Sequence, residues 1–296
     1  MTSLANPPKL NLDMAYEKVG EYGCAQWLLT FVVCIARNAN NYIYYPYAYL
    51  VLEQHYLCEN ESGEFLSCTR EEICEGENLP NYKVDTSYEY YLDNWFVQMN
   101  LVCTPVATIG LMVTLYFIGF ACGGMLYALP DKLGRKKALL IGCLLTAIGQ
   151  TISIFVPTIR ARCLAFFLMG LAQVKAGTSY VWLSECTSLP YKSRAFTYIN
   201  LFDAIPMALV GIYYIYLTKN WEWICLAMMI LTYVAILLIY FCPESPRWHL
   251  INGRTPEAIV SLNYIAKMNG KEARIPTNAI FVEDPTNFIN SALFTQ

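Results

Sequence analysis

The chain has 296 residues, of which 56% are hydrophobic and 15% are charged, and its mean hydropathy is +0.35. A soluble domain carries about 25% charged residues, so this composition excludes an ordinary soluble protein and places the chain in a membrane. The net charge of −3 gives no sign of the basic surface that nucleic-acid binding requires. The length accommodates six membrane spans but not twelve.

Apolar segments predict six spans. Three of them are free of charge, at 104–129, 138–156 and 223–242. At about 1.5 Å per residue, the shortest of the three matches the thickness of the hydrocarbon core. Three more segments carry one charge each within the predicted span: 24–47 with Arg37, 162–184 with Lys175 and 196–217 with Asp203.

The connecting segments predict the orientation. Lys and Arg concentrate in 130–137, 185–195 and 243–296, which fall on one side of the predicted membrane. Because basic residues in short loops remain on the cytoplasmic or matrix side, we expect that side to be the inner one. The polar segment 1–23 lacks an apolar signal core, so it is expected to be an uncleaved inner tail. The choice between a plasma membrane and a mitochondrial inner membrane stays open.

The predicted outer loop, 48–103, is strongly acidic. Residues 52–94 hold eleven acidic and two basic residues, which gives a net charge of −9 and leaves +6 for the rest of the chain. Such a segment is typical of a solvated loop outside the bilayer.

This loop also carries candidate modification sites. Four of the twelve cysteines lie in it or at its edge: Cys58, Cys68, Cys74 and Cys103. They predict two disulfides in any of three connectivities, with four free thiols as the alternative. The other eight cysteines lie in or beside spans, where we expect buried, inert thiols. Asn60 begins an Asn-Glu-Ser glycosylation sequon, a short pattern that also arises by chance.

No arrangement typical of an enzyme occurs in the sequence. The two histidines, His55 and His249, fall on opposite sides of the predicted membrane, and no Cys/His spacing resembles a zinc site. There is also no GxxxxGK[ST] loop for ATP. We therefore expect no enzymatic activity, no metal and no cofactor.

Three motifs carry a family resemblance. Asp131-Lys-Leu-Gly-Arg-Lys-Lys137 follows the second predicted span, Pro243-Glu-Ser-Pro-Arg-Trp248 follows the sixth, and Asn100-Leu-Val-Cys103 precedes the second. Together they resemble the N-terminal half of a major facilitator superfamily transporter, most of all the organic cation and carnitine transporter family. The resemblance covers about residues 15–275. It implies an all-α integral membrane fold of six transmembrane helices with an acidic, cysteine-containing outer loop.

The resemblance also implies a conformational latch on the inner face, although a simple basic loop that sets topology would look the same. Two departures weaken the match: Phe166 stands where the family has an arginine, and Glu185 lies two residues too far from Arg194 to fit the family's acid. The candidate latch residues are Asp131, Gly134, Arg135, Lys136, Arg194, Glu244 and Arg247, with Glu244 and Arg247 tying the end of span six to Arg194 or Asp131.

Polar residues inside predicted spans are candidates for a cavity, because they are costly in a bilayer. Arg37, Asn40 and Asn41 share one helical face at i, i+3 and i+4. Lys175 and Asp203 are expected to neutralise each other as a structural pair, with a cavity-lining role as the alternative.

The family's transporters bind substrate between two six-helix halves. This sequence ends about fifty residues after the sixth predicted span, so we expect a non-transporting accessory or structural subunit that packs against other membrane proteins and lipids. The alternative is a half-transporter that pairs with a second six-helix half to carry organic cations or zwitterions, such as carnitine, by alternating access.

Overall fold

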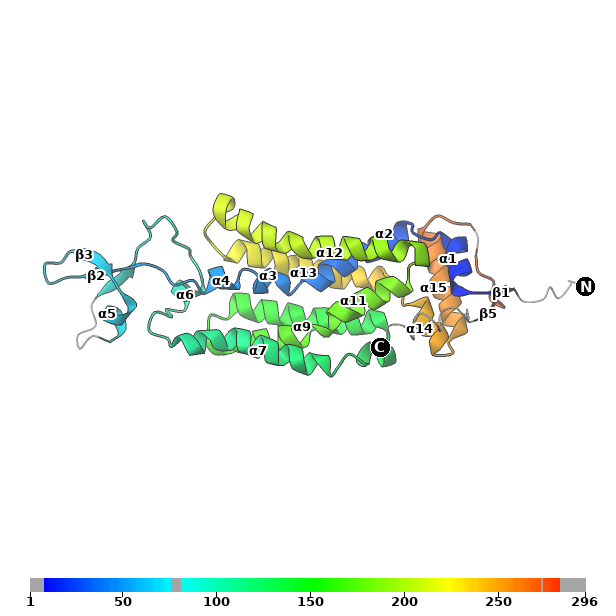
Figure 1. The fold of residues 1–296 in the computed structure, drawn as a ribbon, viewed down its shortest axis with the longest axis horizontal. Helices are drawn as coiled ribbons and strands as arrows, with labels where there is room; N and C mark the ends of the chain where they lie inside the picture. Colours follow the sequence, from blue (N-terminus) through cyan, green and yellow to red (C-terminus); the bar gives the residue numbers. More distant parts are fainter. Residues whose placement is uncertain (1–7, 76–80, 273, 283–296) are drawn as a thin grey trace, which may run out of the picture.

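The computed structural model describes residues 8–75, 81–272 and 274–282, so parts of both predicted tails lie outside the described residues. Figure 1 shows an elongated bundle in which the long helices run along one axis. A small domain of strands lies at one end and short helices lie at the other. We call these the disulfide end and the Arg135 end.

Within the described residues, five helices or helix pairs are long and apolar enough to cross a membrane. They are α7 (Val106–Gly124), α9 (Arg135–Phe155), α10 with α11 (Ile159–Leu171 and Val174–Glu185), α12 with the π-helix η1 (Leu189–Ile212 and Tyr213–Leu217), and α13 (Glu222–Phe241). A sixth candidate arises only if α1 (Leu12–Val19) and α2 (Cys24–Asn38), which are bent by 106°, are counted together.

The region of the predicted first span is not one continuous helix. It consists of α2, then α3 (Asn41–Tyr44) and α4 (Tyr47–Leu50). Asparagine side chains compete with the backbone here: Asn38 donates to the carbonyl of Cys34, and Asn41 donates to Asn38. Pro46, which cannot donate to a helix, precedes α4.

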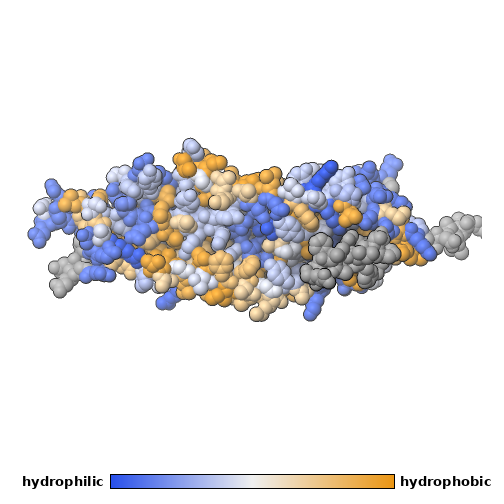
Figure 2. Space-filling view, in the orientation of Figure 1, coloured by the Kyte–Doolittle hydropathy of each residue, from blue (hydrophilic) through white to orange (hydrophobic). Residues whose placement is uncertain are grey.

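The surface of the bundle is apolar where it would meet lipid. Large side chains such as Ile215, Met207 and Leu237 are more than half exposed. Figure 2 shows hydrophobic residues over much of the central part of one face, hydrophilic residues at both ends, and a hydrophilic area in the middle of that face. A bundle that faced lipid on every side would have an uninterrupted apolar surface, and the hydrophilic area interrupts it here.

Glycines bring α7 and α10 into close contact. A Cβ atom on Gly119 would overlap the carbonyl oxygen of Phe167, and one on Gly170 would overlap that of Tyr116. Small residues allow such approach of backbones in membrane helices. At Gly110 and Gly124, in contrast, an added Cβ would meet nothing within 4 Å.

The disulfide end is a three-stranded antiparallel sheet in the order β3-β2-β4, formed by Phe65–Cys68, Tyr56–Glu59 and Tyr82–Val84. Two short helices accompany it, α5 (Arg70–Cys74) and α6 (Trp95–Gln98). Disulfides join Cys58 to Cys68 and Cys74 to Cys103, which selects one of the three connectivities that the sequence left open.

At the Arg135 end, both ends of the described chain form one layer. The N-terminal α1 packs on α15 (Thr255–Met268) through Tyr16, Val19 and Leu262, among others. Strand β1 (Lys9–Leu10) pairs in parallel with β5 (Ile280–Phe281). The short helices α8 (Leu129–Leu133) and α14 (Pro246–Ile251) complete this end.

Candidate functional site

Arg135 is the centre of the predicted latch. Its guanidinium donates two hydrogen bonds to Glu185, 3.1 Å from Nε to Oε2 and 3.0 Å from Nη2 to Oε1, and a third of 2.6 Å to Asp131. The side chains of Arg135 and Glu185 are only 7% and 10% exposed, whereas Asp131 is 70% exposed. The bidentate pair joins the start of α9 to the end of α11.

Glu244 takes a different role from the expected one. One of its carboxylate oxygens accepts the backbone N–H groups of Arg135 and Lys136, at 3.0 and 3.1 Å, and so caps the N-terminus of α9. Gly134 has φ +103°, and a Cβ there would overlap Glu244. The glycine is therefore needed both for its backbone conformation and for this close approach.

The expected links from Glu244 and Arg247 to Arg194 or Asp131 are wrong for the described residues. Arg194 is exposed and lies over the ring of Tyr191 at 5.5 Å, and none of the ion pairs in the described part includes Arg247. The connection to Asp131 comes instead from Trp248, whose Nε1 donates to its carbonyl at 2.7 Å. The sequence spacing could not reveal a bond to the backbone.

Two further contacts complete the Arg135 end. Lys136 Nζ donates to the carbonyls of Tyr240 and Cys242 at the end of α13, at 2.8 and 2.7 Å. The hydroxyl of Tyr16 donates to the carbonyl of Glu185. Burial raises the pKa of Tyr16 well above its usual range, so this hydroxyl remains a donor at physiological pH.

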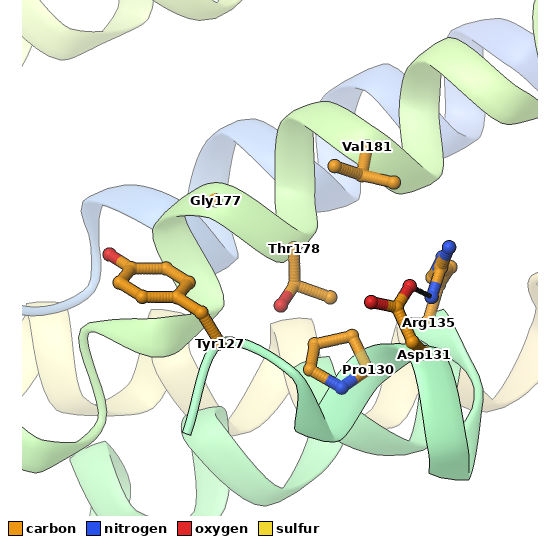
Figure 3. Close-up of a pocket in the computed structure, with 7 residues that line it drawn as sticks. All are labelled: Tyr127, Pro130, Asp131, Arg135, Gly177, Thr178 and Val181. Atoms are coloured by element: carbon orange, nitrogen blue, oxygen red, sulfur yellow. Dashed lines mark hydrogen bonds and ion pairs between the residues drawn. The ribbon is translucent and has the colours of Figure 1, made fainter. Parts of the chain in front are cut away.

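A pocket of about 150 Å³ opens beside this cluster (Figure 3). Asp131 and Arg135 form one side of it, and Gly177 and Thr178 of α11 form another, with Tyr127 at the edge. The pocket lies between α11 and the segment that runs from Tyr127 to Arg135.

A second polar cluster lies in the middle of the bundle. Arg37 on α2 donates to both carboxylate oxygens of Asp203 on α12, at 3.0 Å and 3.1 Å from Nε and 2.6 Å from Nη2. The two side chains are 22% and 24% exposed. The Arg37 guanidinium also lies 4.6 Å from the ring centre of Tyr180 on α11, whose hydroxyl donates to Asn200. This Arg37 face combines charge, an aromatic ring and partial exposure.

The expected pairing of Lys175 with Asp203 is therefore wrong. Asp203 is held by Arg37, and Lys175 Nζ instead donates to Thr146 Oγ1 on α9 at 3.0 Å. Lys175 is fully buried, so it does not line an open surface in this arrangement.

The three residues predicted to share a face in span one separate, because the backbone breaks after α2. Asn40 is buried and donates to the carbonyl of Met169 at 2.6 Å, while its own oxygen accepts from Thr146. Asn41 is half-buried and bonds to Asn38. Only Arg37 reaches the partly exposed cluster.

Asn60 lies beyond β2 in the disulfide end, where its side-chain oxygen accepts the backbone N–H groups of Ser62 and Glu64. The side chain is partly exposed. In the part of the chain that the structure describes, no group of three or more His, Cys, Asp or Glu residues is arranged to hold a metal ion.

Sequence reasoning did not select Glu185, Tyr180 or Thr146 as site residues. The spacing from Glu185 to Arg194 argued against the acid, but Arg135 on α9 contacts Glu185 on α11 directly, whatever that spacing. Tyr180 and Thr146 have ordinary residue types for spans, and no local signal distinguishes them.

Within the described residues, the fold is a helical bundle with five candidate membrane spans, or six if α1 and α2 are counted together. The family model described as "Sugar (and other) transporter" matches residues 23–281, and the chain belongs to this family. It is a transporter-family protein rather than an enzyme.

Several similar proteins are solute carriers. Solute carrier family 22 member 2 of Rattus norvegicus is 30% identical over 182 residues, which is 60% of this chain and 32% of the relative. Organic cation transporter 1 of Caenorhabditis elegans is 26% identical over 305 residues, 92% of this chain and 52% of the relative. The chain thus spans from about a third to about half of the curated relatives it matches.

Among solved structures, the proton:xylose symporter XylE bound to 6-bromo-6-deoxy-D-glucose matches with a TM-score of 0.56 and 14% identity. The match covers 85% of this chain and 50% of the symporter. At this identity the likeness extends to the fold alone. Half of the superfamily fold is therefore present.

Proposed function

We propose that this chain supplies one six-helix half of a transporter that moves organic cations or zwitterions by alternating access. The second half would lie on the same polypeptide or on a partner. The observation that carries this proposal is the Arg37 face, where an ion pair, Tyr180 and Asn200 remain partly exposed in the middle of the bundle. Charges facing lipid would be costly, so a water-filled path between two halves explains them best.

The chemistry of the Arg37 face suits a substrate with a positive centre. Asp203 offers a carboxylate, and tyrosine rings attract cations through their faces. Tyr44 adds an exposed aromatic side chain on α3, where it stacks on Tyr116 with ring centres 5.4 Å apart. A zwitterion could interact with both members of the Arg37–Asp203 pair.

The Arg135 cluster would then control movement of the two halves. Asp131 keeps one carboxylate oxygen on Arg135 and is otherwise exposed beside the pocket. A helix from the second half could insert there and be released during the cycle. This exposure of Asp131 supports the inner-side latch that the sequence motif predicted.

We also place the disulfide end outside the cell, with the termini in the cytoplasm of a plasma-membrane protein. Two disulfides favour an oxidising compartment over the matrix side of a mitochondrion. Glycosylation of Asn60 would follow from the same orientation. A glycosidase-sensitive mass shift that disappears in Asn60→Gln supports the orientation, and an unglycosylated, mitochondrially localised protein contradicts it.

Uptake measurements test the transport proposal. Cells that display the full chain are assayed for saturable uptake of radiolabelled tetraethylammonium and carnitine, beside Asp203→Asn and a lipid-facing control, Leu237→Ala. Uptake that is lost in Asp203→Asn and kept in Leu237→Ala supports the proposal. Equal, unsaturable uptake by all three proteins at matched surface levels rejects it.

An accessory subunit is the second candidate. Two observations favour it: Asp203 is already neutralised by Arg37, and Phe166, where the family has an arginine, is buried against Trp95 and Tyr47. Blue-native electrophoresis separates the candidates. An accessory role predicts a large complex with unrelated membrane proteins, whereas a single small species contradicts it.

A further inference from the structure

Lys175 is an ionisable amine enclosed inside the bundle, without a carboxylate partner in the part of the chain that the structure describes. It lies in the first turn of α11 and has no exposed surface. Its side-chain nitrogen bonds to the Thr146 hydroxyl, and none of the four ion pairs among the described residues includes it. An uncompensated charge in such a place is costly, so the amine is better accommodated neutral.

The groups that face Lys175 do not supply a negative charge. Cys143 on α9 is a buried thiol, and Arg37 on α2 is itself a cation whose charge is taken up by Asp203 of α12. On α7, Tyr116 bonds to Gln173. The remaining neighbour, α14, lies at the Arg135 end with Arg247 and His249, beside Glu185 and away from the start of α11.

The surroundings of Lys175 are also poised to move, because two helix breaks meet there. The break after α10 leaves the carbonyl of Met169 without its usual helical partner, and Asn40 bonds to it. The break after α2 leaves the carbonyl of Ala39 free for Gln150 at 2.7 Å. Broken helices at mid-membrane are typical of the moving parts of transporters.

A chain of hydrogen bonds connects Lys175 to the break in span one. Lys175 Nζ bonds to Thr146 Oγ1, and Thr146 Oγ1 bonds to Asn40 Oδ1 at 2.8 Å. Arg37, one helical turn before Asn40, is partly exposed. Movement of α2 against α9 and α11 would therefore bring water to the amine.

We propose that Lys175, enclosed in this structure, is a proton-binding site of the conformational cycle: the amine is neutral while enclosed and protonated when the breaks in α2 and α10–α11 open to water. As the bundle opens, the nitrogen lone pair takes one proton from a hydronium ion, so an N–H bond forms, an O–H bond breaks and a water molecule is released. Before closure the ammonium returns this proton to a water molecule, which becomes hydronium. This inference rests on the proposed transport function for its biological meaning, but not for its test.

Hydrogen–deuterium exchange on the purified full chain in nanodiscs tests the site without any substrate. Exchange of peptides from α2, α9 and α11 is measured between pH 7 and pH 10, toward the range in which a water-exposed lysine titrates, and corrected for the intrinsic rate. Because one proton is coupled to opening, we expect corrected exchange to rise on acidification by up to about tenfold per pH unit. Exchange that is independent of pH in the unmodified protein overturns the proposal.

Variants assign the effect to this residue. Lys175→Arg carries a permanent charge and should exchange fast at every pH, whereas Lys175→Met cannot be protonated and should exchange slowly at every pH. The matched control is Lys137→Met, an exposed lysine at the start of α9, which should keep the normal pH dependence. An unchanged pH dependence in Lys175→Met also overturns the proposal.

The outcomes separate this inference from the transport proposal. Substrate uptake together with pH-independent exchange rejects the proton site and leaves the transport function. Exchange that depends on pH and on Lys175, together with no uptake of either substrate, supports the proton site and rejects the transport function.

Discussion

Each end of the bundle contains a buried arginine, but only one of the two arginines has carboxylate partners. At the Arg135 end, Arg135 has Glu185 and Asp131 as partners. At the disulfide end, Arg162 is equally buried but belongs to none of the ion pairs in the described residues. It donates to the Ser153 carbonyl and to the Gln98 amide.

Aromatic rings take the place of the missing carboxylate. The Arg162 guanidinium lies 4.1 Å from the ring centre of Trp95 and 5.6 Å from that of Trp221. Indole faces attract a cation but do not neutralise it, and Nη1 of Arg162 has no hydrogen-bond partner among the residues that the structure describes. We infer that the Arg135 end is stabilised by paired charge and the disulfide end by covalent links and packing.

The largest effect should come from breaking the paired end. Glu185→Ala leaves Arg135 buried without its bidentate partner, and we expect a loss of about 3–5 kcal/mol in the free energy of unfolding. Denaturant titration in detergent micelles measures this. Asp131→Asn is the matched control: it removes an exposed partner of the same arginine and should cost less than about 1 kcal/mol. Equal losses would contradict the role given to burial.

Removing covalent links tests the other end. Replacing Cys74 and Cys103 together by Ser opens a loop of 29 residues, and loop entropy predicts a loss of about 3.6 kcal/mol. The same change at Cys58 and Cys68 opens only 10 residues and should cost about 2.7 kcal/mol. Unfolding followed by fluorescence gives both values. The reverse order would show that loop length does not set the stability of this end.

The contact between α7 and α10 should respond to side-chain volume. In Gly170→Ala the new methyl group overlaps the Tyr116 carbonyl, so α7 and α10 must separate at a cost of about 1–3 kcal/mol. Gly124→Ala, also at a helical position of α7 but in open space, should be neutral or slightly stabilising. A tolerated Gly170→Ala would reject the close contact of these helices.

The smallest effect on stability should come from giving Arg162 a carboxylate partner, as Arg135 has at the other end. Gln98→Glu offers Arg162 a carboxylate where an amide now accepts a hydrogen bond of 2.6 Å. We expect a gain of about 1 kcal/mol, because hydrogen bonds between charged groups are stronger. Thermal unfolding at low and high salt checks it. A loss of stability would mean that the two indole rings already satisfy the cation.

The sequence predicts best those structural features that are determined within one segment of the chain. Charge-free apolar runs indicate α9 and α13, because hydropathy and length act within one segment. The break after Asn38 was missed, since the apolar run continues through it and only asparagine side chains mark it.

Site residues were harder to predict than spans. The predicted Lys175–Asp203 pairing was wrong because it assumed that the two residues lie at matching depths on continuous helices. In the structure, Asp203 pairs with Arg37. Glu185 was discounted on its spacing along the chain, although its pairing with Arg135 depends only on where α9 and α11 meet. Cysteine number predicted two disulfides, but their connectivity needed the β2–β3 pairing that brings Cys58 close to Cys68.

The central claim is that the Arg37 face lines a water-filled path between two transporter halves, and its accessibility to water tests this claim most directly. Cysteines are placed at Asn200, on that face, and at Leu237, on the apolar surface, in a background where the more exposed Cys24 and Cys122 are replaced by Ser. Both proteins are treated in membranes with a water-soluble, charged thiol reagent. A water-filled path between two halves predicts rapid labelling at 200, slowed by substrate, and none at 237. Equal resistance of both positions would mean that the Arg37 face is sealed against lipid or protein, which would contradict the transport account.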